Sequence, residues 1–164
     1  MISIGIDVGI HGAVVALDRY GRVIFYADCP VRPGARNRKF FKPSEMRKIL
    51  VQWIDLNAKV FIEYSQAMRK DGRAQGATSS HKTGEGYGLW VGIVVGLDMP
   101  YDVIPPKDWQ RVMHSGEPGD PKKRSEAVCK KLFPDLPIYG LRGGYIDGRG
   151  DAALIAEFGR RMIK

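Results

Sequence analysis

The sequence predicts an α/β protein with a mixed five-stranded sheet flanked by helices, and three observations support this fold class. Residues 2–8 alternate strictly between apolar and small or polar side chains, as a sheet strand does. Two further short strands, predicted at residues 13–18 and 22–27, follow at once and indicate an antiparallel meander. From residue 43 onward, helical periodicity alternates with short apolar runs, which is typical of parallel strands covered by helices.

The opening meander contains the first candidate functional residue. In residues 2–8 the isoleucines share one face of the strand, and Asp7 lies on the other face. The second and third strands are joined by a tight turn at residues 19–21. We therefore expect Asp7 at the end of the first strand, on the face where glycines leave room for a ligand.

The remainder of the chain contains five helical segments and two strands. Helical periodicity marks residues 43–57, 84–97, 106–113, 122–133 and 150–163, and strands are predicted at residues 60–64 and 101–104. Residues 65–83 have no periodic apolar pattern, so we expect a mobile loop there. Because no repeat or linker interrupts this order, residues 1–164 are expected to form a single domain.

The composition favours a polyanionic partner and argues against a membrane protein. The 26 Lys and Arg residues exceed the 18 Asp and Glu residues and give a net charge of +8, which suits nucleic acid, although solubility alone also explains such an excess. No apolar run reaches the roughly 18 residues of a membrane span, and no basic leader precedes the first strand. Cys29 and Cys129 lack a CxxC context, which indicates reduced thiols in a cytoplasmic protein.

Four acidic residues stand where predicted strands end or where the last helix begins. Asp7 closes the first strand, and Glu63 shares a strand face with Phe61 inside a short apolar run. Asp147 and Asp151 are four residues apart near the start of the last helix, and Asp151 lies on the apolar stripe of that helix. Because a buried anion requires compensation, the four acids predict a common metal site.

Three of the acids also have simpler explanations. Asp7 fits a turn-capping role, and Asp147 fits an ordinary loop residue. Asp151, in a first helical turn, gains about 0.3–1 kcal/mol from the helix dipole. The dipole explains the position of Asp151 but not its apolar neighbours.

The type of acid cluster indicates which metal ion to expect. Clustered carboxylates repel one another, and divalent cations with oxygen ligands relieve that repulsion. We therefore expect Mg²⁺, with Mn²⁺ as a substitute, and two ions about 4 Å apart would suit phosphodiester hydrolysis. Zinc is disfavoured because Cys pairs are missing and His11, His81 and His114 are scattered along the chain.

Six strings in a fixed order carry a resemblance to a known family. They are IGIDVGIHGAVVALD at residues 4–18, VFIEYSQAM at 60–68, GYGLWVGIVVGL at 86–97, VIPPKDWQ at 103–110, KKRSEAVCKKLFP at 122–134 and DGRGDAALIAEFG at 147–159. With these strings the whole chain resembles the RuvC-like Holliday junction resolvases, particularly their bacteriophage branch. The resemblance implies a ribonuclease H-like fold.

The resemblance also implies an activity, an assembly and a site. It implies a homodimer that cuts symmetrically placed strands of a four-way DNA junction, or other branched DNA, with two metal ions during DNA recombination and repair. By this resemblance Asp7, Glu63 and Asp151 are the core catalytic metal ligands, and Asp147 takes the more variable fourth position. The setting that it implies is the cytoplasm of a bacterial or phage-infected cell.

Basic residues in three segments are the candidate DNA contacts. They are Arg69, Lys70, Arg73 and Lys82 after the Glu63 strand, Arg36, Arg38 and Lys39 beside two phenylalanines, and Lys122, Lys123 and Arg124 at a helix start. Cations at a helix start are unfavourable unless an anion is near, which suggests phosphate. A solvated loop with two core phenylalanines is the alternative for the second segment, and an ordinary solvated face is the alternative for the third. Some relatives carry an aromatic wedge three residues after the strand glutamate, where this chain has Gln66, with Met68 the nearest apolar candidate.

The helix at residues 84–97 carries a ridge of glycines at every fourth position. These are Gly84, Gly88, Gly92 and Gly96. Because glycine is a poor helix former, such a ridge suggests close approach by another element. The ridge either seats the helix on the sheet or meets a second subunit, and we expect this helix to contribute to a homodimer interface.

Three other functions remain open to the sequence. A ribonuclease H-like nuclease that cuts RNA·DNA hybrids or structured RNA would carry the same acids. A junction-binding protein without catalysis would not need all four. The sugar kinase and actin-like ATPase group also opens with a strand and a DxG turn, but it requires a second, duplicated domain.

Overall fold

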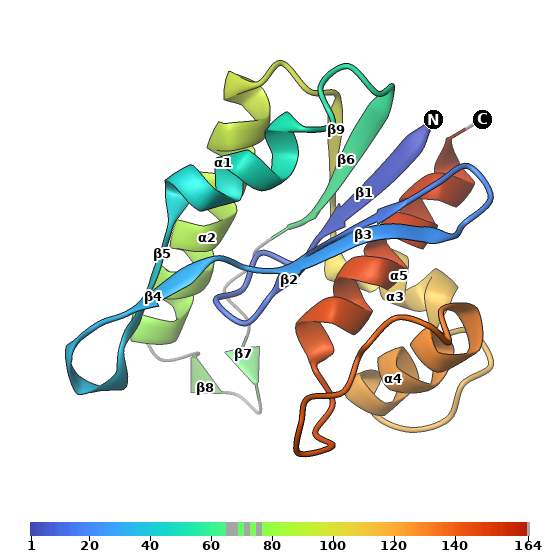
Figure 1. Cartoon of the computed structure of the whole chain (residues 1–164). Helices are drawn as coiled ribbons and strands as arrows, with labels where there is room; N and C mark the ends of the chain where they lie inside the picture. The colour runs from blue at the N-terminus through green and yellow to red at the C-terminus, as the bar shows by residue number, and fades with distance from the viewer. Residues whose placement is uncertain (65–68, 71–72, 75–76, 164) are drawn as a thin grey trace.

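The computed structural model describes residues 1–64, 69–70, 73–74 and 77–163, and its centre is a mixed five-stranded sheet (Figure 1). Across the sheet the strands are β3 (Val23–Asp28), β2 (Ala13–Leu17), β1 (Ile2–Ile6), β6 (Ala58–Glu63) and β9 (Tyr101–Ile104). The pairs β3–β2 and β2–β1 are antiparallel, whereas β1–β6 and β6–β9 are parallel. The predicted meander followed by parallel strands is confirmed.

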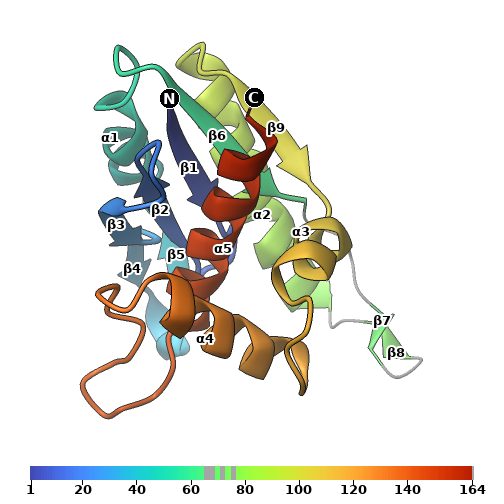
Figure 2. The same cartoon turned by 90° about the vertical axis from the view of Figure 1, so that its right-hand side faces the viewer.

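In the described part of the chain, five α-helices lie on the two faces of this sheet. They are α1 (Pro43–Val51), α2 (Ala77–Gly96), α3 (Pro106–Met113), α4 (Pro121–Leu132) and α5 (Asp147–Met162). One face packs against α1 and α2, and the other packs against α3, α4 and α5 (Figure 2). No helix in the described ranges combines the length and the apolar character that a membrane crossing requires.

Two small hairpins extend beyond the central sheet. The first pairs β4 (Val31–Pro33) with β5 (Lys39–Phe41) around a short 3₁₀ turn, and the second pairs β7 (Arg69–Lys70) with β8 (Arg73–Ala74). Both extend toward the same end of the molecule as the start of α5 (Figure 1). That end also carries the carboxyl ends of β1 and β6.

Two predicted boundaries are wrong. The first helix ends at Val51 rather than at residue 57, because the chain turns through residues 52–57 to enter β6. The predicted loop at residues 65–83 instead contains the β7–β8 hairpin and the first turns of α2. The remainder of that loop, residues 65–68, 71–72 and 75–76, lies outside the described residues.

The side chains of β1 and β6 point alternately to the two faces of the sheet and so contribute to two separate hydrophobic cores. Ile4, Ile6 and Val60 face the α1–α2 side, whereas Phe61 joins the core beneath α5. All four side chains are fully buried. Because successive strand residues point to opposite faces, the small residues of β1 are left on the α5 side.

Helix α5 lies directly on the backbone of β1. A Cβ at Gly5 would stand 2.1 Å from the Ala152 carbonyl oxygen, so only glycine permits this approach. The Ser3 hydroxyl donates a hydrogen bond of 2.6 Å to the carbonyl of Ala156 in the same helix. Farther along α5, Gly159 leaves the space that the Phe61 ring occupies. The helix is therefore held in close register with the strand that precedes Asp7.

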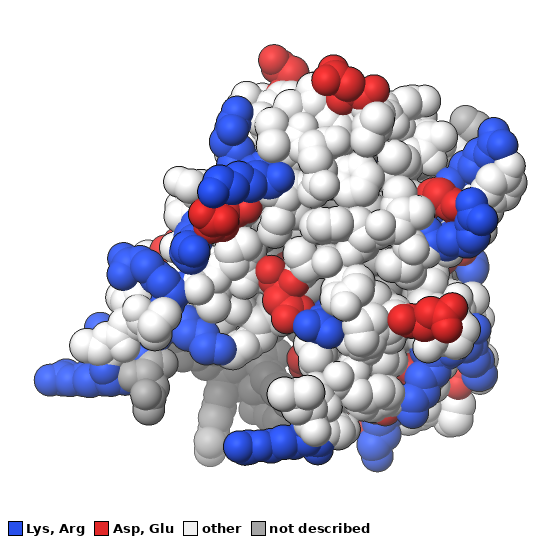
Figure 3. Space-filling view, viewed as in Figure 1, with Lys and Arg blue, Asp and Glu red and all other residues white. Residues whose placement is uncertain are grey.

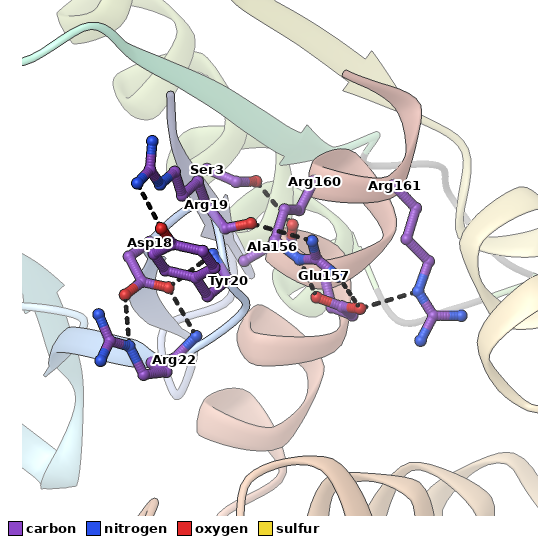
Figure 4. A network of polar contacts seen from close by, with 9 residues as sticks. All are labelled: Ser3, Asp18, Arg19, Tyr20, Arg22, Ala156, Glu157, Arg160 and Arg161. Carbon is purple, nitrogen blue, oxygen red and sulfur yellow. Dashed lines mark hydrogen bonds and ion pairs between the residues drawn. The ribbon is translucent and has the colours of Figure 1, made fainter. Parts of the chain in front are cut away.

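Charged residues tie the C-terminal half of α5 to the β2–β3 turn (Figure 4). The buried carboxylate of Glu157 accepts hydrogen bonds from Arg160 and Arg161 at 2.6–2.9 Å. Arg160 also donates to the backbone carbonyl of Arg19 in that turn, at 3.2 Å. A buried acid with two guanidinium partners is compensated, which explains why the pKa of Glu157 is lowered by Arg160 and Arg161 despite its burial.

Arg149 anchors the other end of α5. Its guanidinium makes two hydrogen bonds, of 2.6 and 2.8 Å, to the Asp28 carboxylate at the end of β3. It donates a third, of 2.6 Å, to the carbonyl of Pro137. Because Arg149 stands between Asp147 and Asp151 in sequence, this contact fixes the helical turn that carries both acids.

The glycine ridge of α2 does not contact the sheet. No atom of the described chain comes within 4 Å of a Cβ built on Gly84, Gly88, Gly92 or Gly96. The helix packs on the sheet through Trp90 and Val94, which are fully buried. The alternative that the glycine ridge packs against the sheet is therefore wrong, because the bulky residues on the opposite side of α2 fill the space between the helix and the sheet.

Candidate active site

Asp7 and Glu63 stand at the carboxyl ends of two neighbouring parallel strands. Asp7 directly follows β1, and Glu63 is the last residue of β6. Ile6 pairs with Ile62 in the β1–β6 register, so the two acids occupy the next level of the sheet. Both point to the α5 side, as the alternation predicted. One oxygen of Asp7 accepts a hydrogen bond of 3.1 Å from the backbone N–H of Gly9.

Asp151 joins these acids from the first turns of α5. Its charge contributes to the raised pKa of Glu63, and the charge of Asp7 contributes to the raised pKa of Asp151. The Oδ1 atom of Asp151 is buried and has no hydrogen-bond partner among the described residues. The sequence prediction that Asp151 faces the sheet agrees with this placement.

The three acids share an electrostatic conflict. Burial raises the pKa of Glu63 from 4.5 to about 8, and the charges of Asp7 and Asp151 add to the rise, whereas the Trp109 N–H opposes it. Burial likewise raises the pKa of Asp7 from 3.8 to about 6 and that of Asp151 from 3.8 to about 7. Among the described residues, no cation contributes to the pKa of Asp7 or of Glu63, and the charge of Lys122 lowers the pKa of Asp151 without offsetting its rise. Such a site favours bound positive charge.

Asp147 has a different environment from the other three acids. It is the first residue of α5, it is exposed, and its Oδ2 lies 3.1 Å from the ammonium of Lys122. Its charge still raises the pKa of Asp7 and of Asp151. Asp147 therefore borders the cluster at its solvent edge, paired with a cation of α4.

The donor set suits a hard cation. Among the residues that the structure describes, no group of three or more His, Cys, Asp and Glu side chains is arranged so that it could hold a metal ion. The carboxylates nevertheless offer oxygen donors, including the unpaired Oδ1 of Asp151, and such donors fit Mg²⁺ or Mn²⁺. Burial, above all, raises the pKa of Cys29 and of Cys129 to about 12, so these thiols stay protonated and are poor metal ligands.

Three residues that the sequence reasoning did not single out, Trp109, Ser125 and Tyr145, act on the acids, and His114 supports one of them. Trp109 donates a hydrogen bond of 2.9 Å from its Nε1 to Oε1 of Glu63. Ser125 lowers the pKa of Asp151 by hydrogen bonding, and His114 contacts Ser125 at 3.0 Å. Trp109 and Ser125 lie within two of the strings that carry the family resemblance, which is the signal that could have drawn attention to them.

Tyr145 presents a second unpaired oxygen beside the cluster. Its hydroxyl is buried without a partner in the described part of the chain, and a Cβ on Gly150 would stand 1.9 Å from it. Burial raises the pKa of Tyr145 strongly, and the charges of Asp151 and Asp147 add to the rise. Its hydroxyl therefore stays protonated and can serve as a hydrogen-bond donor at this site.

A cavity of about 370 Å³ opens beside Asp147. Its lining includes Tyr145, His11 and Lys39, and the Lys39 ammonium lies 3.4 Å from Nδ1 of His11. One predicted DNA contact, Lys39, is thus brought next to the acids from the β4–β5 hairpin. The cavity offers both a cation and a carboxylate to a ligand.

The other predicted DNA contacts are distributed around this end of the molecule. Arg36 and Arg38 are exposed on the β4–β5 hairpin, where Lys and Arg side chains gather at the lower left of the space-filling view (Figure 3). Lys82 forms an ion pair of 2.7 Å with Glu85 and lies 4.7 Å from the centre of the Phe40 ring. Only the backbone is described for Arg69, Lys70 and Arg73, which form the β7–β8 hairpin.

Acidic side chains of the protein itself lie at the N-terminus of α4. Lys122 pairs with Asp147, and the N-cap Asp120 accepts a hydrogen bond from the backbone N–H of Lys123. Arg124 differs from its neighbours, because its Nε is buried and its charge lowers the pKa of His114. The predicted need for an anion near this helix start is met in part by these two aspartates.

The raised pKa values predict that the metal-free protein loses stability as the pH rises. The folded state binds the protons of these acids more tightly than the unfolded chain does. The free energy of unfolding is therefore highest below the ordinary pKa values of 3.8 and 4.5, and it decreases as the pH rises through the folded-state pKa values of about 6 to about 8. Glu63→Gln removes the ionisation with the highest pKa. With chelator present, the Tm of this variant should exceed that of the unaltered protein at about pH 9 and match it near pH 4.

Thermal unfolding at both pH values measures the difference. Asp55→Asn, at an exposed acid in the turn after α1, is the matched control and should show no pH-dependent gain. A Glu63→Gln protein that is less stable than the unaltered protein at the higher pH would contradict the claim that the ionised Glu63 side chain destabilises the metal-free protein.

Solved structures share this fold. A Thermus thermophilus RuvC structure superposes with a TM-score of 0.62 at 14% sequence identity, over 99% of this chain and 96% of that chain. T. thermophilus RuvC in complex with a Holliday junction substrate gives a TM-score of 0.62 at 13% identity, over 99% and 97% of the two chains. No protein-family model and no curated protein matches the sequence. The chain therefore has the ribonuclease H-like fold of RuvC, as the resemblance implied.

Proposed function

We propose that this protein is a RuvC-like Holliday junction resolvase, a metal-dependent endonuclease that cuts symmetrically placed strands of four-way or related branched DNA. The observation that carries the proposal is the group of Asp7, Glu63 and Asp151 at the carboxyl end of two parallel strands, where burial raises the pKa of all three acids and the charge of Asp7 adds to the rise at Glu63 and at Asp151. The fold shared with RuvC supports it, as does the net charge of +8. DNA recombination and repair would be its setting, in the cytoplasm of a bacterial or phage-infected cell.

The four acids would hold two Mg²⁺ ions, or Mn²⁺ in their place, through carboxylate oxygens. Asp7, Glu63 and Asp151 are the core ligands in this proposal, and Asp147 would join them by leaving its ion pair with Lys122. When bound, the ions activate water and stabilise the negative charge on the phosphodiester. The Gly9 N–H orients Asp7, and the Tyr145 hydroxyl is available to donate to an oxygen at the site.

The basic segments would hold the DNA around these acids. Arg36, Arg38 and Lys39 belong to a hairpin whose Lys39 reaches the cavity beside Asp147. Arg69, Lys70 and Arg73 belong to a second hairpin that follows Glu63 in the chain. Lys82, Lys122, Lys123 and Arg124 complete the proposed set. The Asp147 carboxylate that now pairs with Lys122 is replaceable by phosphate, because exposed ion pairs contribute little.

A homodimer would supply two related sites for paired incisions. The uncovered side of α2 supports this proposal, because its glycine ridge meets no atom of the described chain and Val95 beside it is 52% exposed. Small residues let two helices approach closely, and a twofold axis repeats one active site at a fixed distance. We propose that the segment from Gly84 to Leu97 forms the dimer contact.

Loss of one core acid should abolish incision without abolishing DNA binding. Asp7→Asn, Glu63→Gln and Asp151→Asn each keep the side-chain shape and remove a charged ligand. Incision of a four-way junction in Mg²⁺ should fall to below roughly a hundredth, since changes in the outer shell of a metal site alone cost about 10- to 100-fold. Gel assays of cleavage and of binding measure the two effects separately.

The same assay separates the competing functions. A linear duplex and an RNA·DNA hybrid are the comparison substrates, and Asp55→Asn is the control variant. Preferential cleavage of the hybrid would favour the other ribonuclease H-like nucleases. Binding of the junction without Mg²⁺-dependent cleavage would favour a non-catalytic protein. Full cleavage by Asp151→Asn would refute the assignment of the site.

Neutralising the β4–β5 hairpin should weaken DNA binding and reduce its salt dependence. For Arg36→Gln, Arg38→Gln and Lys39→Gln combined, the slope of log K against log salt should fall by about 0.9 for each lost phosphate contact. Fluorescence anisotropy over a range of salt concentrations measures the slope. Arg47→Gln, an exposed cation on α1, is the control, and an unchanged slope in the triple variant would remove this hairpin from the interface.

A bulky charged residue on the glycine ridge should dissociate the dimer. Gly92→Arg introduces volume and charge where the contact requires neither, while space in the subunit itself is open. Sedimentation should show a monomer for this variant and a dimer for the unaltered protein. Leu56→Arg, an exposed apolar residue outside α2, should stay dimeric. An unaltered protein that is monomeric both free and on junction DNA would contradict the assembly.

A further inference from the structure

A layer of buried polar side chains from α3 and the start of α4 underlies the acid cluster. Trp109 is fully buried, and its indole N–H donates to Oε1 of Glu63 over 2.9 Å. His114 and Ser125 are 6% and 3% exposed and contact each other at 3.0 Å. The His114 ring meets the Trp109 ring edge-on, with 5.3 Å between the ring centres. These three residues connect Glu63 on one side with Asp151 on the other.

The hydrogen-bond directions in this layer follow from the chemistry of its members. An ionised carboxylate only accepts hydrogen bonds, so the Ser125 hydroxyl donates its single proton to Asp151, whose pKa it lowers. The Ser125 oxygen must then accept from His114, which requires the proton of the neutral imidazole to sit on Nε2. Burial and the charge of Arg124 lower the pKa of His114 and keep the ring neutral. The layer thus offers one donor to Glu63, from Trp109, and one to Asp151, from Ser125.

Packing alone does not account for these residue types. Burying polar groups costs free energy unless they are hydrogen-bonded, and apolar side chains of similar size would fill the same space without that requirement. The core contains a direct comparison, because the buried indole of Trp53 on the other face of the sheet has no hydrogen-bond partner among the described residues. Trp109 therefore differs from Trp53 in directing its donor to a functional carboxylate.

We propose that Trp109, His114 and Ser125 are positioning residues that orient Glu63 and Asp151 for binding of divalent metal ions. The inference rests on the proposed metal-dependent function. A glutamate has three rotatable side-chain bonds, and an indole donor on one of its oxygens restricts them while the other oxygen stays available to an ion. Ser125, itself held by His114, does the same for Asp151. The layer thereby sets the ligand geometry before the ions arrive.

Binding of Mg²⁺ at about pH 8, measured by calorimetry, tests the inference without relying on activity. Trp109→Phe, Ser125→Ala and His114→Leu should each weaken Mg²⁺ binding by about 10- to 100-fold and reduce the rise in Tm that Mg²⁺ produces. Trp53→Phe removes an equally buried indole N–H from the opposite core and should leave Mg²⁺ binding unchanged. Ser125→Thr and His114→Gln retain the donors and should restore most of the affinity.

The outcomes separate this inference from the proposed function. Mg²⁺ binding by Trp109→Phe and Ser125→Ala within twofold of the unaltered protein would overturn the positioning role. Equal losses in Trp109→Phe and Trp53→Phe would do so too, because they would indicate a general packing effect. An unaltered protein that binds no Mg²⁺ would overturn the metal site and this inference with it. Weakened Mg²⁺ binding in a protein that does not cut junctions would support the positioning residues and refute the junction substrate.

Discussion

The contact between α5 and β1 is the constraint on which the rest of the site depends. The missing Cβ of Gly5 lets the backbone of α5 rest on the strand, and the Ser3 hydroxyl fixes the register through Ala156. Because α5 begins one turn before Asp151, this register brings that acid over the end of β1, where Asp7 lies. A side chain at position 5 would lift the helix, and the distance between the two acids would grow with it.

Bringing three acids together creates an electrostatic cost that the protein itself does not remove. Two arginines of α5 pair with other carboxylates, Arg149 with Asp28 and Arg160 with Glu157. Glu157 is a buried acid whose charge is balanced, because Arg160 and Arg161 lower its pKa despite its burial. The pKa of Glu63, in contrast, is raised to about 8. The difference marks the cluster as a place where positive charge is to be supplied from outside.

The two faces of the sheet have different tasks in this arrangement. The α1–α2 face is apolar throughout its centre, and α2 leaves its glycine ridge uncovered on the outside. The α5 face combines apolar packing with polar side chains that reach the acids, chiefly Trp109 and Ser125. The polar side chains that reach the acids therefore lie on one face only, and the β4–β5 hairpin brings Lys39 to the cavity beside Asp147.

The sequence by itself determined the antiparallel meander followed by parallel strands, because alternation and helical periodicity are local properties. For the same reason it predicted that Asp7 lies on the strand face opposite the isoleucines, that Glu63 shares a face with Phe61, and that Asp151 faces the sheet. Only the tertiary structure decided that Asp147 pairs with Lys122, that the ridge of α2 faces away from the sheet, and that Trp109 and Ser125 reach the acids. These contacts join residues far apart in the chain, so they depend on how helices pack, which no local pattern encodes.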